Sequence, residues 1–258
     1  MSSDSFMGKV ALVTGGASGL GKATTERLSA KGTIVYAVDL VIPDQEEEPR
    51  EGLIKYRKCD VTREDDVANV ISEIKFKHSR LDFVVNCAGI LGHVEPVYDF
   101  ETEAMHSTQM FMDIFRVNVY GTFNVIRHAV GLMADNPPGD DGQRGVIVNT
   151  SSRARKDGAA RLVAYNASKG AVSAMTVPLA REFGAVGIRV VAIAPGASET
   201  PMLQNEEYSW VLKGHAAKTV FPMRPGKPQE FAHMVEFTIE NHLINATTVR
   251  LDGGFRGF

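Results

Sequence analysis

A tyrosine and a lysine stand four residues apart in the segment Tyr165-Asn166-Ala167-Ser168-Lys169. On a helix, side chains at this spacing lie on the same face. An ammonium group beside a phenol favours the phenolate and lowers the tyrosine pKa from about 10 towards working pH. Tyr165 is therefore a candidate general acid and base for interconverting a hydroxyl and a carbonyl group. The alternative is an ordinary solvated pair, because chance Tyr-x-x-x-Lys spacings are frequent.

A serine hydroxyl precedes this pair at a position that faces a ligand crevice in a parallel sheet. Ser152 stands 13 residues before Tyr165 and follows the apolar run Val146 to Asn149, which we expect to be a buried strand. The carboxyl ends of such strands line the crevice. Ser152 is thus the candidate for holding the substrate oxygen, and Ser151 is the competing candidate.

A glycine-rich turn follows the first apolar run of the chain and precedes a predicted helix. Glycines at positions 15, 19 and 21 permit a tight turn and let a pyrophosphate approach the helix N-terminus, whose N–H groups favour an anion. A plain β–α turn is the alternative. The predicted cofactor contacts in this turn are Gly15, Ser18, Gly19, Leu20 and Gly21.

An aspartate ends the next predicted strand, 18 residues after Gly21. A carboxylate at Asp39 would accept hydrogen bonds from the ribose hydroxyls of an adenosine and would repel a 2′-phosphate. No arginine stands at positions 17, 18 or 40 to neutralise that phosphate. The pattern favours NAD over NADP, although Asp39 could instead open a turn.

Further candidate cofactor contacts follow other strands. Asp60 and Val61 could flank an adenine ring, and the segment 86–89 ends another predicted strand in the same crevice. The complete set of these further candidates is Asp60, Val61, Asn86, Cys87, Ala88, Gly89, Tyr165, Lys169, Pro195, Gly196, Ser198 and Thr200.

These candidate residues can form one site only if the fold brings several strand ends together. The chain alternates short β-branched runs with helical patterns, which is typical of such a fold. Expected strands are Val10–Val13, Ile34–Val38, Leu81–Val85, Val146–Asn149, Arg189–Ile193 and Val249–Leu251, and expected helices are Leu20–Ala30, Glu64–Lys77, Phe111–Ala134 and Tyr165–Phe183. The alternation predicts an α/β fold over residues 1–258: a single doubly wound Rossmann domain with a parallel sheet and helices on both faces. Residues 91–109 read as irregular, residues 135–144 as a surface loop, and residues 200–228 as a partly helical substrate loop.

Composition excludes several classes of protein. The chain has 258 residues, 44% of them hydrophobic, with a net charge of −3, so nucleic acid is not an expected partner. Two cysteines and scattered histidines predict no metal site. No apolar run is long enough to span a bilayer, and the first residues lack a secretory pattern, so we expect no membrane association and a cytoplasmic protein. An uncleaved mitochondrial address remains open.

In order and spacing, the glycine turn, Asp39, the segment 86–89, Asn118, Ser152, Tyr165, Lys169 and Pro195-Gly196 resemble the short-chain dehydrogenase/reductase family. The resemblance runs from residue 9 to residue 254 and implies hydride transfer with a nicotinamide cofactor. It implies that Tyr165 is the acid and base, and that Lys169 lowers its pKa and binds the nicotinamide ribose. It further implies that Ser152 orients the reacting oxygen and that Asn118 positions a water molecule in a proton relay.

A closer resemblance is to the type-2 3-hydroxyacyl-CoA dehydrogenase subfamily. The segments that carry it are 121–127, 136–149, 193–196 and 249–253. This resemblance implies NAD as cofactor, a homotetramer, and 3-hydroxyacyl-CoA thioesters or other secondary alcohols, including hydroxysteroids, as small-molecule substrates.

Two departures from the subfamily bear on the substrate. The stretch 91–115 has no lysine or arginine and carries Glu95, Asp99, Glu101 and Glu103, which would repel CoA phosphates at close range. The segment after Ser152 reads Arg153-Ala154-Arg155 where the relatives are largely apolar. Guanidinium groups match carboxylates and phosphates, so Arg153 or Arg155 is a candidate substrate clamp. Solvated loop charges are the alternative.

Two other functions stay open beside the hydroxyacyl or hydroxysteroid dehydrogenase. The charged segment after Ser152 suggests a ketoreductase of specialised metabolism that acts on an acidic substrate. A scaffold or binding subunit built on the same fold is the alternative from another class, and only the resemblance suggests it.

Overall fold

The computed structural model describes residues 5–43, 53–139, 141–204, 206 and 208–256. Seven parallel strands form one sheet in the order β3-β2-β1-β4-β5-β6-β7. The strands are β1 Val10–Thr14, β2 Ile34–Asp39, β3 Ile54–Lys58, β4 Phe83–Asn86, β5 Gly145–Thr150, β6 Ile188–Pro195 and β7 Thr247–Leu251. This is the α/β Rossmann-type sheet that the sequence predicts.

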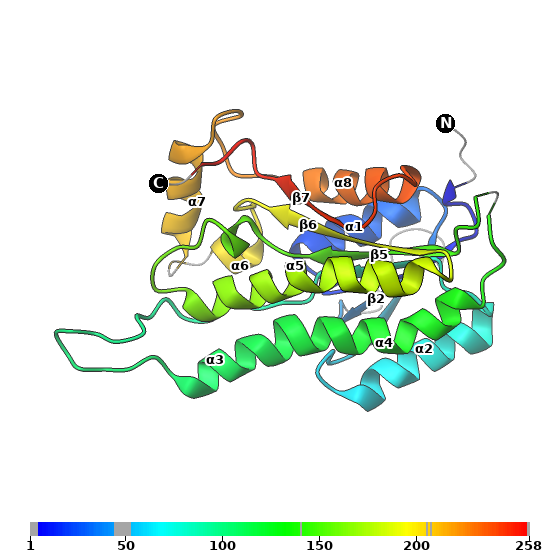
Figure 1. Ribbon diagram of the computed structural model, residues 1–258, viewed down its shortest axis with the longest axis horizontal. Coiled ribbons are helices and arrows are strands. Elements are labelled where there is room, and N and C mark those ends of the chain that lie inside the picture. The colour runs from blue at the N-terminus through cyan, green and yellow to red at the C-terminus, as the bar shows by residue number, and fades with distance from the viewer. Residues whose placement is uncertain (1–4, 44–52, 140, 205, 207, 257–258) are drawn as a thin grey trace.

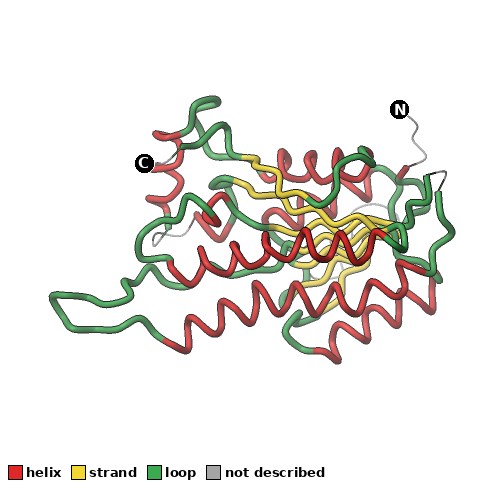
Figure 2. The backbone as a smooth tube through the Cα atoms, viewed as in Figure 1, coloured by secondary structure: helices red, strands yellow, loops and turns green. Residues whose placement is uncertain are grey.

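Helices cover both faces of the sheet, which forms the central layer in Figures 1 and 2. One face is covered by α1 Gly19–Ala30 and α8 Pro228–Glu240. The other face is covered by α2 Glu64–His78, α4 Thr122–Ala134 and α5 Val163–Gly184. Because both faces are covered, the central strands β1 and β4 are fully buried and largely apolar instead of alternating, whereas the edge strands β3 and β7 are only partly buried.

Strand β1 illustrates how one strand supplies two cores. Val10 and Leu12 pack towards α2, α4 and α5, whereas Ala11 and Val13 pack towards α1 and α8. Successive side chains of a strand point to opposite faces, so a run of four apolar residues is what a doubly covered strand requires. The sheet is thereby fixed in position relative to both helix layers.

The predicted helix Phe111–Ala134 begins earlier and is not uniform. It consists of α3 Thr108–Phe115, the π-helical segment η3 Arg116–Gly121, and α4. Ser107 caps α3 by accepting a hydrogen bond from the N–H of Met110, a signal that our sequence prediction overlooked. Asn118 lies within η3, and π-helical turns of this kind often accompany functional sites.

The region after β6 is partly helical, as expected. It contains α6 Pro201–Gln204 and α7 Ser209–Lys218, and both helices lie at the carboxyl end of the sheet in Figure 1. Residues 91–107 form a long irregular excursion ahead of α3. Among the described helices, none combines the length and apolar character that crossing a bilayer requires.

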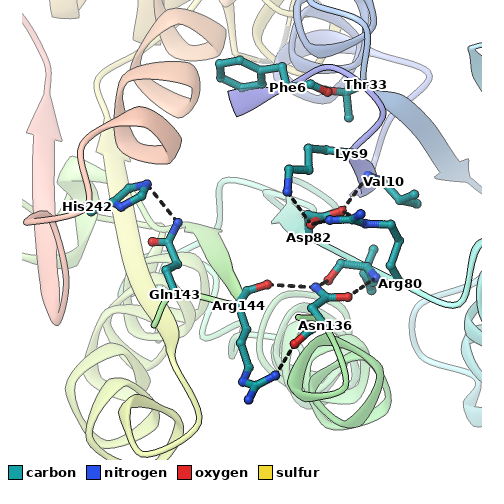
Figure 3. Close-up of polar contacts among 11 residues, drawn as sticks. Phe6, Lys9, Val10, Thr33, Arg80, Asp82, Asn136, Gln143, Arg144 and His242 are labelled. Carbon is teal, nitrogen blue, oxygen red and sulfur yellow. Dashed lines mark hydrogen bonds and ion pairs between the residues drawn. The ribbon is translucent and has the colours of Figure 1, made fainter. Parts of the chain in front are cut away.

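The amino end of the sheet is held by a buried polar network (Figure 3). The carboxylate of Asp82 accepts the N–H of Val10 at 2.9 Å and pairs with Arg80 at 2.6 Å and Lys9 at 3.5 Å. The side-chain amide of Asn136 donates to the main-chain oxygens of Leu81 and Arg144 at 2.7 and 2.8 Å. These contacts join the chain ahead of β1, β4 and β5, opposite the end where the predicted site residues gather.

Candidate active site

A cavity of about 540 Å³ opens at the carboxyl ends of the strands. It lies where the strand order reverses, since β1 leads outward to β2 on one side and β4 leads outward to β5 on the other. Ligands of open α/β sheets bind at such switch points. Nearly all predicted site residues line this cavity; among them only Asn86, Asn118 and Arg155 do not.

At two positions of the turn between β1 and α1, other backbone atoms lie so close that only glycine fits. A Cβ on Gly15 would lie 2.9 Å from the main-chain nitrogen of Ala88, and Gly15 has a φ of +62°. A Cβ on Gly21 would lie 2.0 Å from the main-chain oxygen of Gly15. Ser18, the N-cap residue of α1, makes no side-chain cap, so the first turn of α1 presents N–H groups towards the cavity. These features fit a pyrophosphate.

Asp39 ends β2 and is held rigidly by the main chain. Its Oδ1 accepts the N–H of Leu40 at 2.8 Å and its Oδ2 accepts the N–H of Ala17 at 3.2 Å. The carboxylate also lines the cavity. It therefore stands where the sequence analysis expects the ribose of an adenosine, next to the glycine turn.

The adenine end is bordered by Asp60 and Val61, as expected, and by Cys59, which the sequence analysis did not single out. Burial raises the pKa of the Cys59 thiol to about 12. Asp60 accepts hydrogen bonds from the N–H and hydroxyl of Thr62 at 2.9 and 2.8 Å, which fixes the turn after β3. Cys59, Asp60 and Val61 thus border the cavity at the end of β3, where the sequence analysis expects an adenine ring.

Tyr165 and Lys169 lie on α5, and both line the cavity. The Nζ of Lys169 lies 5.9 Å from the centre of the Tyr165 ring and donates to the main-chain oxygen of Thr150 at 2.8 Å. Burial lowers the pKa of Lys169 to about 8. The predicted face of the helix is therefore aimed at the cavity.

The pKa of Tyr165 differs from the sequence expectation. Burial raises it, although a hydrogen bond with Ser152 and the positive charge of Arg153 act in the opposite direction. Lys169 is not among the groups that shift it. The physical reason is that the ammonium group is directed at Thr150, so desolvation of the phenol outweighs the expected charge effect.

The two candidate serines have different surroundings. Ser151 is fully bonded inward, because its Oγ donates to the main-chain oxygen of Lys169 at 2.9 Å. Ser152 accepts the N–H of Ala154 at 3.1 Å and is hydrogen-bonded to Tyr165. The geometry favours Ser152 as the hydroxyl beside the acid–base group, and Ser151 ties β5 to α5.

Asn118 and Asn86 support the cavity from behind. The side chain of Asn118 accepts the N–H of Ile90 at 2.8 Å and donates to the main-chain oxygen of Ile90 and to Ser168. Asn86 donates to Asn149 at 2.9 Å between β4 and β5. Both side chains are buried. The Oδ1 of Asn86 has no hydrogen-bond partner among the described residues, whereas both polar atoms of the Asn118 amide are bonded. Asn118 therefore positions the loop after β4, and its water-relay role stays a prediction.

The substrate end contains one of the two candidate arginines. Arg153 lines the cavity, whereas Arg155 does not, and the Nε of Arg155 is buried without a hydrogen-bond partner in the described part of the chain. Three further lining residues lie in the expected substrate loop, although no motif singles them out: Leu203, Trp210 and Val211. Phe255 also lines the cavity, and it lies outside every segment that the sequence analysis assigned to the substrate.

The acidic stretch after β4 contributes little to the cavity. Of residues 91–109 only Leu91 lines it, and the stretch projects beyond α3 (Figure 1). Asp99 accepts the N–H groups of Glu101 and Thr102 at 3.0 and 3.1 Å, so it closes its own turn. The expected repulsion of a CoA phosphate at close range thus has no support from residues within the cavity itself.

In the described part of the chain, no three histidine, cysteine, aspartate or glutamate residues are grouped in a way that could hold a metal ion. Cys87 lines the cavity, but burial raises its pKa to about 11, which disfavours the thiolate that nucleophilic attack requires. The Cys87 thiol is therefore not favoured as a nucleophile.

Sequence comparison identifies a family model and several known enzymes that are similar to this chain. A model of short chain dehydrogenases matches residues 9–209. The chain is 44% identical over 250 residues to the 3-hydroxyacyl-CoA dehydrogenase type-2 of Drosophila melanogaster, covering 96% of this chain and 97% of that protein. It is 42% identical over 254 residues to the enzyme of the same name from Homo sapiens, covering 98% and 97%.

Solved structures with a similar fold include enzymes of the same kind. The structure of 3-hydroxyacyl-CoA dehydrogenase type-2 from Mycobacterium avium superposes with a TM-score of 0.88 at 33% identity, covering 99% of this chain and 98% of that one. Levodione reductase superposes with a TM-score of 0.83 at 30% identity, covering 96% and 98%. The chain belongs to the short-chain dehydrogenase family and is an oxidoreductase of that family, as its motifs predict.

Proposed function

We propose that this protein is an NAD-dependent dehydrogenase that interconverts a secondary alcohol and a ketone. One observation carries the proposal: a single cavity has Asp39 and the glycine turn at one end and Ser152, Tyr165 and Lys169 at the other. That arrangement suits an extended dinucleotide whose nicotinamide reaches the acid–base group.

In alcohol oxidation, NAD supplies the hydride acceptor. Tyr165 accepts the proton of the substrate hydroxyl at its phenolate oxygen, and Ser152 donates a hydrogen bond to the substrate oxygen. The hydrogen bond with Ser152 and the charge of Arg153 favour the phenolate. Lys169 is held in place by its hydrogen bond to Thr150, on the helix that carries Tyr165, where it can bind the nicotinamide ribose. In the reverse direction Tyr165 returns the proton to the carbonyl oxygen.

NAD is proposed over NADP because of the charge at Asp39. A 2′-phosphate would meet this carboxylate, whose two oxygens are already fixed by main-chain N–H groups and so cannot easily turn away. Leu40, the next residue along the cavity wall, is apolar and offers no positive charge. The ribose diol of NAD, by contrast, can donate hydrogen bonds to the carboxylate.

The names of the relatives suggest which class of substrate to test first. Proteins at 42–44% identity carry the name 3-hydroxyacyl-CoA dehydrogenase type-2, so 3-hydroxyacyl compounds are the proposed class, with hydroxysteroids next. We also propose a homotetramer in the cytoplasm. Light scattering after size exclusion tests the assembly, and cell fractionation tests the compartment.

The test is cofactor reduction by the purified protein. NAD or NADP is mixed with 3-hydroxybutyryl-CoA, 3-hydroxybutyrate, hydroxysteroids and small secondary alcohols, and absorbance of the reduced cofactor is followed. Turnover with NAD at a kcat/KM well above that with NADP supports the proposal. Turnover with NADP alone contradicts the cofactor assignment, and the absence of turnover with every compound of the panel contradicts the proposed reaction.

A further inference from the structure

We infer that Arg153 binds an anionic group of the substrate, so that the preferred alcohol carries a free carboxylate close to its carbinol carbon. The inference rests on the proposed function and deepens it, because it names a hydroxy acid, rather than a neutral alcohol or a thioester, as the substrate class.

The position of Arg153 is the first argument. It directly follows Ser152, begins the short helix η4 Arg153–Arg155, and lines the same cavity as Tyr165. The positive charge of Arg153 is close enough to lower the pKa of the Tyr165 phenol. An anion held by this guanidinium group would therefore lie near the reacting oxygen.

The guanidinium group is held in place on one of its faces. Its Cζ lies 3.8 Å from the centre of the Phe255 ring, which is buried at 4% exposure. A guanidinium plane stacked on an aromatic ring keeps its N–H groups pointing outward at the edge, where they can bind a planar carboxylate. Phe255 thus orients the guanidinium group of Arg153 without accepting hydrogen bonds from its N–H groups.

Those N–H groups have few partners. An arginine has five N–H donors, and the structure gives Arg153 one weak hydrogen bond, to the main-chain oxygen of Asp157 at 3.5 Å. Arg153 forms no ion pair within the described residues. The adjacent carboxylates of Asp157 and Asp252 instead pair with Arg250, whose Nη2 lies 2.5 Å from Asp157.

The local balance of charge favours a single negative group. Among the described residues, three guanidinium groups gather around two carboxylates: Arg153, Arg250 and Arg256 around Asp157 and Asp252. Burial lowers the pKa of Arg153, which is the sign of a charge that is only partly solvated. One monovalent anion in the cavity would balance the charges of these described residues, and it would replace the water that the arginine has lost.

Arg155 and Lys156 show that position, not charge alone, distinguishes Arg153. Both carry a positive charge within three residues of it, yet neither lines the cavity. Lys156 is exposed to solvent. Lys156→Met is therefore the matched control, since it removes the same charge from the same segment outside the cavity.

A purely structural role is the competing explanation, because Arg153 also anchors Phe255. Arg153→Met keeps an unbranched chain against the ring and removes the charge, whereas Arg153→Lys keeps the charge but not the planar group. The substrates are chosen to match: racemic 3-hydroxybutyrate, its methyl ester and its CoA thioester share the carbinol and differ in the free carboxylate.

The first experiment measures kcat/KM with NAD for the three substrates. Arg153→Met is expected to reduce kcat/KM for 3-hydroxybutyrate about 10- to 100-fold, mainly through KM, in line with loss of a charged hydrogen bond. For the methyl ester, Arg153→Met should change kcat/KM less than about threefold. Arg153→Lys should recover part of the loss on the acid, and Lys156→Met should leave kcat/KM unchanged for both substrates. An equal loss on acid and ester, or no loss on the acid, overturns the inference.

The second experiment does not depend on turnover. Trp210 is the only tryptophan of the chain and lines the cavity, so its fluorescence reports binding. In the presence of NAD, butyrate and its neutral analogue butyramide are titrated, and neither can be oxidised at C3. Tighter binding of butyrate that Arg153→Met weakens at least tenfold supports the inference even if the panel shows no turnover. Equal binding of butyrate and butyramide, or no effect of Arg153→Met, contradicts it.

Discussion

Lys169 donates a hydrogen bond from Nζ to the main-chain oxygen of Thr150, at 2.8 Å, across the junction between α5 and β5. A second bond at the same junction joins the Oγ of Ser151 to the main-chain oxygen of Lys169, at 2.9 Å. Together they fix the helix that carries Tyr165 against the strand end that carries Ser152. Tyr165 and Ser152, the proposed acid–base group and its neighbouring hydroxyl, are thereby held on elements that are fixed to each other.

The two adjacent serines should respond differently to alanine. Ser152→Ala removes the hydroxyl beside Tyr165 and is expected to lower kcat at least 100-fold with little change in stability. Ser151→Ala removes a buried brace and should lower the free energy of unfolding by about 1 kcal/mol while reducing kcat only a few fold. Steady-state kinetics and urea denaturation of both variants check this. Equal losses of kcat would mean that the assignment of Ser152 is wrong.

Lys169 should make stability depend on pH. Burial lowers its pKa from 10.5 to about 8. Below about pH 8 the folded protein carries the buried ammonium, and its cost to folding is fully present. As pH rises from about 8 to 10.5 the folded state loses this proton while the unfolded chain keeps it, so this cost declines.

The matched comparison is Lys169→Met. Relative to wild type, the variant should gain stability that is greatest below pH 8 and shrinks towards pH 10.5, by about 1.4 kcal/mol per unit of pKa displacement. Urea denaturation at several pH values measures the difference, and other titrating groups cancel between the two proteins. A difference that does not change with pH would contradict the assignment.

Asp39 should control the choice of cofactor. Asp39→Ala removes the carboxylate that faces a 2′-phosphate, and Leu40→Arg adds a positive charge on an exposed residue of the cavity wall. The double variant is expected to raise the NADP-to-NAD ratio of kcat/KM at least tenfold, with Asp39→Ala alone giving a smaller change. An unchanged ratio would show that discrimination arises elsewhere.

Gly21 should tolerate no side chain. A Cβ there would lie 2.0 Å from the main-chain oxygen of Gly15, so Gly21→Ala must shift the turn and is expected to cost about 1–3 kcal/mol or more of stability. The control is Gly131→Ala on α4, where a Cβ meets nothing within 4 Å and helix propensity predicts a neutral or stabilising effect. Thermal unfolding of both variants gives the comparison.

Asp82 should matter for folding and not for chemistry. It is 4% exposed and is held by Lys9, Arg80 and the N–H of Val10 at the amino end of the sheet. Asp82→Ala leaves the buried N–H of Val10 without its acceptor and the partly exposed Arg80 without its ion pair, and it is expected to lower stability by about 1–3 kcal/mol. The folded fraction should retain its NAD affinity, measured by fluorescence of Trp210. A stable variant with weakened NAD binding would contradict this division of roles.

Much of the sheet could be predicted because buried parallel strands are apolar throughout. Ile34–Val38 and Val146–Asn149 lie within β2 and β5 as found. Strand β3 was not delimited, because Ile54–Lys58 is a partly exposed edge strand with three basic residues. The helix ahead of Asn118 was predicted to start late, since its Ser107 cap stands in an irregular stretch.

The site was predictable where motifs are local and obscure where segments meet only in the fold. The glycine turn and Asp39 are adjacent to a strand in the sequence and line the cavity. Phe255, by contrast, reaches Arg153 from the far end of the chain, so nothing in either neighbourhood distinguishes Arg153 from Arg155. The direction of the Tyr165 pKa shift depends on burial, which residue spacing does not reveal.

The most direct measurement is the rate of NAD reduction by wild type and Tyr165→Phe with the best substrate of the panel. The account predicts a kcat at least 100-fold lower for the variant, because the proton acceptor is lost. NAD affinity, measured by fluorescence of Trp210, should stay within about threefold. A Tyr165→Phe variant that keeps most of its kcat while binding NAD normally would show that the proton takes another route.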